Sequence, residues 1–254
     1  MKMRIIILLS LTITMLSLNG CLIPHDPLPA LWFYTFSGGH AEDRDDLLTP
    51  ASFLEIRADG TYTSDLGSFE YGRWSRKDQQ LSLTNQKHST LTFSLNNINH
   101  EEMQLATRKG IPLNFDSRPL PPTRAAEDPF SIDNNRWRLP PARKESAPAI
   151  RNRLFNHCQF WEAYFTWALN NNIATVDVRS TPTPIKIYGN GFTLKPFDEL
   201  PAMWRSYFFD EEDCRKANEV IEDIFLHKNI AWAHTDNKYK MFIGAFQQLE
   251  KYLR

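Results

Sequence analysis

Two periods of apolar residues divide this chain of 254 residues, and they restrict its fold more than any other feature. Within residues 31–113 apolar and polar residues mostly alternate, as in "STLTFSLNN", where Leu91, Phe93 and Leu95 occupy every second position. Period two is typical of half-buried strands. After about residue 150 the apolar residues recur at intervals of three and four, which is typical of amphipathic helices. The pattern predicts an α+β protein whose β part comes first.

Turn signals separate the alternating runs. Asp59-Gly60 lies between "FLEIRA" and "TYTSD", and Asp-Gly between two such runs is a strong hairpin signal. About five to seven strands fit into residues 31–113, so we expect an antiparallel meander that closes into a small barrel or a sandwich. That number of strands argues against a full eight-stranded barrel enclosing a ligand.

Short motifs in this β region are similar to those of a known family. "DGTY" (Asp59–Tyr62) and "YGRW" (Tyr71–Trp74), with Trp32 near the start, resemble the lipocalin-like domains of Bacteroidetes lipoproteins. The resemblance covers about a third of the chain. It implies a barrel-like domain in an exported, lipid-anchored protein.

The sequence after residue 113 predicts a connector and a second domain. Residues 114–135 are rich in proline and lack an apolar period, so we expect a linker there. Residues 136–254 predict helices, including one capped by Asp210, and a hairpin turning at Asn190-Gly191. With strands at residues 135–139, 173–180 and 230–236, the order matches a C-terminal α/β domain of the ferredoxin-like split βαβ type.

The N-terminus predicts export and anchoring. Two basic residues precede an apolar run, Ile5–Leu18, of 14 residues, which is shorter than the roughly 20 that span a bilayer and typical of a signal peptide. Leu18-Asn19-Gly20-Cys21 resembles the bacterial lipobox. The resemblance implies that residues 1–20 are removed and that Cys21 carries acyl chains such as palmitate, which anchor the chain in a lipid bilayer. An ordinary signal with an incidental cysteine is the alternative.

Residues 21–30 hold three prolines and predict a stiff tether. Within residues 22–30, directly after Cys21, Asp26 is the only acidic residue. Surface-exported lipoproteins of the Bacteroidetes type often carry a run of acidic residues there. We therefore expect a lipid-anchored protein of the outer membrane of a bacterial cell envelope, facing the periplasm. Without Lys2 and Arg4 the mature chain has 27 basic against 30 acidic residues, which is not typical of nucleic-acid binding.

The remaining polar motifs do not indicate catalysis. There is no glycine-rich phosphate loop, no G-x-S-x-G and no H-E-x-x-H, so we expect no cofactor, and His227, His234 and Asp236 are too few for a metal site. Cys158 lies on the most apolar helical stripe, where a thiol is inert. If the two helices are neighbours, Cys158 and Cys214 could form a disulfide; two packed free thiols are the alternative.

Two segments could contact a partner. Six basic residues lie between Arg136 and Arg153 and could meet lipid headgroups or an acidic protein, or simply form a solvated face. "MWRSYFF" (Met203–Phe209) is expected to expose an apolar patch. The candidate contact residues are Arg136, Arg138, Trp204, Tyr207 and Phe208.

These observations favour a binding or assembly module for an envelope protein. One alternative is a carrier holding a small apolar ligand in the β domain. The other is an enzyme, such as a hydrolase, whose site is built from residues dispersed in the sequence.

Overall fold

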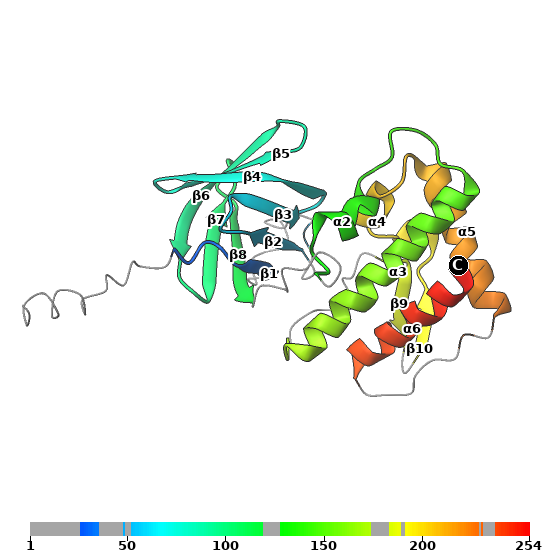
Figure 1. Ribbon diagram of the computed structural model, residues 1–254. Helices are drawn as coiled ribbons and strands as arrows, with labels where there is room; N and C mark the ends of the chain where they lie inside the picture. The colour runs from blue at the N-terminus through cyan, green and yellow to red at the C-terminus, as the bar shows by residue number, and fades with distance from the viewer. Residues whose placement is uncertain are drawn as a thin grey trace, which may run out of the picture.

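The structure is a computed structural model that describes residues 26–35, 48, 52–118, 128–173, 183–188, 191–228, 230 and 237–254. Eight antiparallel strands form a closed barrel in sequential order, and β1 pairs with β8 to complete it (Figure 1). The strands are β1 (Leu31–Thr35), β2 (Phe53–Ile56), β3 (Thr61–Asp65), β4 (Phe69–Lys77), β5 (Gln80–Asn85), β6 (Thr90–Ile98), β7 (Glu102–Ala106) and β8 (Pro112–Arg118). The expected α+β class and antiparallel meander are therefore confirmed.

The expected number of strands was too low. β8 runs to Arg118, so the boundary placed at residue 113 falls inside a strand rather than at the start of a linker. Its five pairs with β1, from Leu31↔Arg118 to Thr35↔Asn114, close the barrel. The Asp59-Gly60 turn between β2 and β3 is confirmed, and Gly60 adopts a φ of 83° there.

Apolar side chains fill the centre of the barrel. The members of this cluster are 4% exposed or less: Leu28, Trp32, Leu54, Ile56, Tyr62, Leu81, Leu83, Phe93, Leu95, Met103, Leu105, Leu113 and Phe115. Leu28 belongs to the segment expected to be a tether, yet it is fully buried and its carbonyl accepts a hydrogen bond of 2.9 Å from Trp32 Nε1. The part of the chain that packs as barrel therefore begins before residue 30.

The outer surface of strands β1 to β4 packs against the helices. Phe33 and Phe53 point away from the barrel centre and share one hydrophobic core with the helical part. The Phe33 ring stacks on Trp167 at 6.0 Å, and the Phe53 ring meets Phe130 edge-on at 4.8 Å. The barrel and the helices are therefore continuous in their packing.

The helical part is built around one long helix, α3 (Ala147–Asn170), which packs mainly against α6 (Lys238–Leu253) and also against α5 (Glu211–His227) (Figure 1). The expected cap of α5 is confirmed, since the Asp210 side chain accepts a hydrogen bond of 2.9 Å from the Asp213 backbone. Among the described residues, no helix is long and apolar enough to cross a membrane. The shorter helices are α2 (Ile132–Asn135), η2 (Arg136–Arg138), η4 (Phe197–Glu199) and α4 (Ala202–Ser206).

The ferredoxin-like layout is not seen in the described residues. Residues 135–139, expected to be its first strand, form the end of α2 and the turn η2 instead, because Ser131 caps a helix that continues into η2. The two strands of the expected hairpin are present as β9 (Ile185–Tyr188) and β10 (Gly191–Leu194), a separate antiparallel two-stranded sheet, while residues 189 and 190 lie outside the described residues. The other two expected strands lie almost wholly outside the described residues.

Candidate functional site

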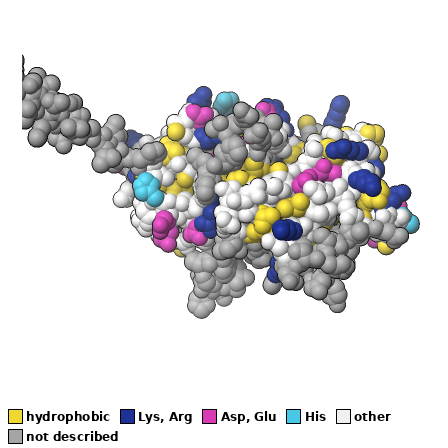
Figure 2. Space-filling model, turned by 60° about the horizontal axis from the view of Figure 1, so that its bottom comes forward, with side chains coloured by type: hydrophobic (Ala, Val, Ile, Leu, Met, Phe, Trp, Pro, Cys, Tyr) yellow, Lys and Arg dark blue, Asp and Glu magenta, His cyan; other side chains and the backbone are white. Residues whose placement is uncertain are grey.

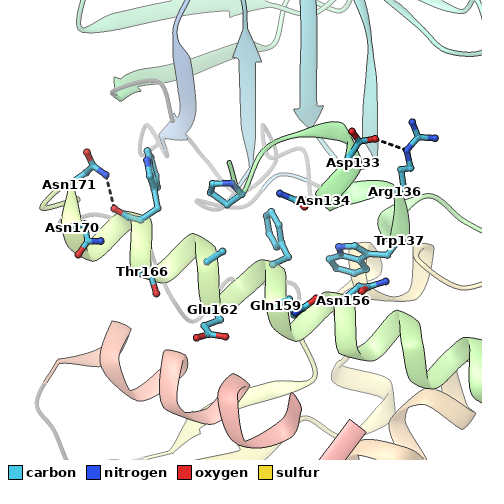
Figure 3. A pocket seen from close by; sticks show the side chains of 14 residues that line it. Asp133, Asn134, Arg136, Trp137, Asn156, Gln159, Glu162, Thr166, Asn170 and Asn171 are labelled. Atoms are coloured by element: carbon cyan, nitrogen blue, oxygen red, sulfur yellow. Dashed lines mark hydrogen bonds and ion pairs between the residues drawn. The ribbon is translucent and has the colours of Figure 1, made fainter. Parts of the chain in front are cut away.

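A groove of about 980 Å³ runs along α3, between that helix and the α2–η2 segment (Figure 3). Its volume is that of a pocket for a sizeable ligand. Its lining is mixed, with amide, hydroxyl and aromatic side chains from three elements. The lining residues are Pro129, Asp133, Asn134, Arg136, Trp137, Asn156, Gln159, Phe160, Glu162, Ala163, Thr166, Trp167, Asn170 and Asn171.

The solvent-facing stripe of α3 forms one wall of this groove and is uncharged. Its members, at intervals of three and four residues, are Asn156, Gln159, Ala163, Thr166 and Asn170. Exposed helix positions usually carry Lys, Glu or Arg, which are good helix formers, whereas Asn and Thr are poorer ones. The asparagines and the threonine of this stripe are therefore not explained by helix stability.

The amides of the stripe are available for contacts. Among the described residues, no hydrogen bond to another part of the protein is made by the side chains of Asn156, Gln159 and Asn170. Each such amide offers two donor hydrogens and an acceptor oxygen. At one end of the groove the Asn171 amide donates to the Trp167 carbonyl at 2.9 Å (Figure 3).

Aromatic residues border the same groove. Trp137, Phe160 and Trp167 are between 3% and 7% exposed, so only their edges reach it. The Nε1 atom of Trp137 is buried and has no hydrogen-bond partner within the described part of the chain. A buried donor without a partner costs about 1–3 kcal/mol.

The charged lining residues neutralise one another or turn away. Arg136 Nε and Asp133 Oδ1 are 3.2 Å apart. Figure 3 shows the Glu162 carboxylate on the side of α3 that faces α6, where it accepts a hydrogen bond of 2.6 Å from the Gln247 amide. The groove therefore presents hydrogen-bonding groups and no net charge.

Glu162 also forms a carboxyl pair with Glu250 of α6. Burial, and then the hydrogen bond and charge of Glu162, raise the pKa of Glu250 to about 8. This raised pKa favours the protonated form of Glu250 at neutral pH. Carboxyl groups in hydrogen-bond contact are closer than the roughly 5–9.5 Å that separates the catalytic pair of a glycosidase, so this pair does not have that geometry.

The residues expected to bind a partner are mostly buried. Trp204, Tyr207 and Phe208 are 0–4% exposed, so the expectation of an exposed apolar patch over Met203–Phe209 is wrong; of its apolar side chains only Phe209, at 44%, is exposed. Aromatic density here serves the core. Arg138 is 2% exposed and pairs with Asp65, while Arg136 alone of the five lies at the groove.

The basic strip is largely engaged within the protein. Lys144 lies 3.3 Å from Asp210, and Arg153 lies 2.7 Å from Glu145. Arg151 donates to the Leu253 carbonyl at 3.0 Å. On the face drawn in Figure 2, basic and acidic side chains are interspersed. These contacts weaken the case for the strip as a docking surface for an acidic partner.

The structure describes two of the three cysteines. Cys158 and Cys214 are buried free thiols, so the disulfide that they could have formed is not made. Burial raises the pKa of Cys158, as expected for a packed thiol. Cys21, the expected lipidation site, and His234 and Asp236 lie outside the described residues. No group of three metal-ligating side chains occurs among those described.

The sequence contains a pattern that indicates the groove, but it lies on the polar face of the helix and not on the apolar face that predicts the core. At helical spacing, the outward positions 156, 159, 163, 166 and 170 are Asn, Gln, Ala, Thr and Asn, a helix face without charge. No protein-family model, no curated protein and no solved structure matches this chain.

Proposed function

We propose that this protein is a lipid-anchored binding module of the bacterial cell envelope, which holds an extended, uncharged polar partner in the groove along α3. The observation that carries the proposal is the uncharged amide stripe that lines this groove of about 980 Å³. A site that binds by hydrogen bonds needs unpaired donors and acceptors on a rigid element, and a long packed helix supplies both.

The proposed localisation depends on the N-terminal sequence. The short apolar run and the lipobox-like "LNGC" support acylation of Cys21 and attachment to the outer membrane, facing the periplasm. Residues 21–27 then separate the anchor from Leu28, which is packed in the barrel. Seven extended residues span at most about 25 Å, so the body would stay close to the bilayer.

The closed eight-stranded barrel supports the resemblance to lipocalin-like domains, but it does not favour the carrier role. Its centre is occupied by Trp32, Tyr62, Phe93, Phe115 and their neighbours. In this proposal the barrel is a rigid support that positions α3 through the shared core. The proposal therefore moves the contact surface, expected from the sequence at the basic strip or the aromatic segment, to the groove.

Photocrosslinking in cells tests the proposal. A photoreactive amino acid at Gln159, which is exposed in the groove, is compared with one at Leu226, which is 70% exposed on α5. The proposal predicts an adduct from position 159 and none from 226, and its loss when Cys21→Ser releases the chain from the membrane. Equal labelling at both positions, or labelling that survives release, contradicts it.

A further inference from the structure

Given the proposed binding role of the α3 groove, we propose that its occupant is an uncharged glycan chain. Three observations carry this inference: the neutrality of the lining, the form of its hydrogen-bonding groups, and the aromatic edges at its wall.

The neutrality of the lining excludes a charged polymer. Asp133 and Arg136 pair with each other, and Glu162 is directed toward α6. A polyanion or a polycation would leave its charges without partners here, and a desolvated unpaired charge is costly. The fitting ligand is polar and uncharged.

The hydrogen-bonding groups favour hydroxyls over a peptide. Peptides are usually bound at a free strand edge, in an apolar groove or by an arginine cluster. None of the described strands lines the groove, so it offers no free strand edge to a peptide, and the amides of Asn156, Gln159 and Asn170 make it polar. An amide that both donates and accepts matches a sugar hydroxyl, which does the same.

The aromatic edges and the length of the groove fit a chain of sugars. Trp137 and Trp167 border it, and their edges offer apolar contacts to the C–H groups of a sugar ring. From Asn156 to Asn170 the helix rises about 21 Å at 1.5 Å per residue, which is long enough for several rings.

Calorimetric titration of the full-length protein in detergent tests this. The probes are three uncharged hexasaccharides, N-acetylchitohexaose, cellohexaose and maltohexaose, beside a neutral peptide of Ser, Asn and Gln. We expect at least one saccharide to bind, and the double variant Asn156→Ala/Gln159→Ala to weaken it at least tenfold. Asn152→Ala, exposed on the same helix but outside the groove, is the matched control and should leave the affinity unchanged.

The outcomes separate this inference from the proposed function. Alanine is the best helix former, so lost binding in these variants would not reflect a melted helix, and the melting temperature checks this. If none of the saccharides binds, or binding is equal in the double variant, the glycan inference is overturned. Groove-dependent binding of the peptide alone would overturn it while leaving the proposed function standing. Absence of all binding together with absence of a crosslink at position 159 would overturn both.

Discussion

At the scale of single residues, Arg138 determines how the barrel and the helices fit together. Its guanidinium is buried, forms an ion pair with Asp65 at the end of β3 and donates to the Tyr207 hydroxyl at 3.0 Å. It also lies 4.8 Å from the Phe160 ring centre and 5.2 Å from that of Phe69. Arginine suits this position because its planar charge pairs with a carboxylate and stacks on aromatic rings.

Removing one partner of this buried pair should be costly. Arg138→Met leaves the Asp65 carboxylate buried without its cation, so we expect a loss of about 3–5 kcal/mol in the free energy of unfolding, measured by urea denaturation. The double variant Asp65→Leu/Arg138→Met should regain most of it, because neither charge remains. If the double variant is as unstable as the single one, the ion pair is not what the packing requires.

Two buried acids should make stability depend on pH. Burial, followed by the charge of Asp128, raises the pKa of Glu55 to about 8. Burial, followed by the hydrogen bond and charge of Glu162, raises the pKa of Glu250 to about 8. Between about pH 4.5 and 8 the folded protein therefore holds protons that the unfolded chain has released. Stability should fall as pH rises through this window.

The melting temperature from pH 5 to pH 9 measures this effect. Glu55→Gln and Glu250→Gln should each flatten the decline, since glutamine cannot ionise. Glu102→Gln, at an exposed position in β7, is the control and should keep the wild-type slope. A rise in stability toward pH 8 in the wild type would contradict the protonated state of both acids.

At the scale of elements, the "YGRW" motif has a steric basis. A Cβ on Gly72 would lie 2.0 Å from the Thr84 carbonyl oxygen of β5, so only glycine allows β4 and β5 to approach this closely. Trp74 Nε1 then donates to the Arg57 carbonyl at 2.8 Å, which ties β4 to the segment after β2. The motif therefore stabilises the barrel.

Gly72→Ala should force β4 and β5 apart. We expect a loss of about 1–3 kcal/mol, the usual range for overpacking, measured by thermal or urea unfolding. Ser75→Ala, an exposed position on the same strand, should stay close to the wild type. A Gly72→Ala variant of wild-type stability would show that the two strands can separate without cost.

The sequence predicted elements better than it predicted their assembly. The periodicity of α3 and α5 and the turn at Asp59-Gly60 are local signals, and the structure confirms them. The β8 strand was missed because its pairing with β1 joins residues about 80 apart. The burial of "MWRSYFF" was missed because it depends on which helices surround it. The groove was missed for the same reason, since α2 and α3 meet only in the folded chain.

At the scale of the whole molecule, the shared core explains why one face of α3 is free. The barrel covers the Phe130 and Trp167 side of the helical part, while α5 and α6 cover the Cys158 and Phe165 side. The uncharged stripe is left between these two contacts (Figure 3). With an anchor at Cys21, this arrangement would hold the groove near the membrane and close to envelope polymers.

In the proposed function, the binding surface of this protein is the groove along α3 and not the barrel. Hydrogen exchange of the protein in native envelope membranes, compared with the same protein in vesicles of the extracted lipids, locates the contact without assuming a ligand. We predict that amides of residues 129–138 and 156–171 gain protection in the native membranes. Protection confined to the barrel strands, or equal exchange in both preparations, would contradict the account.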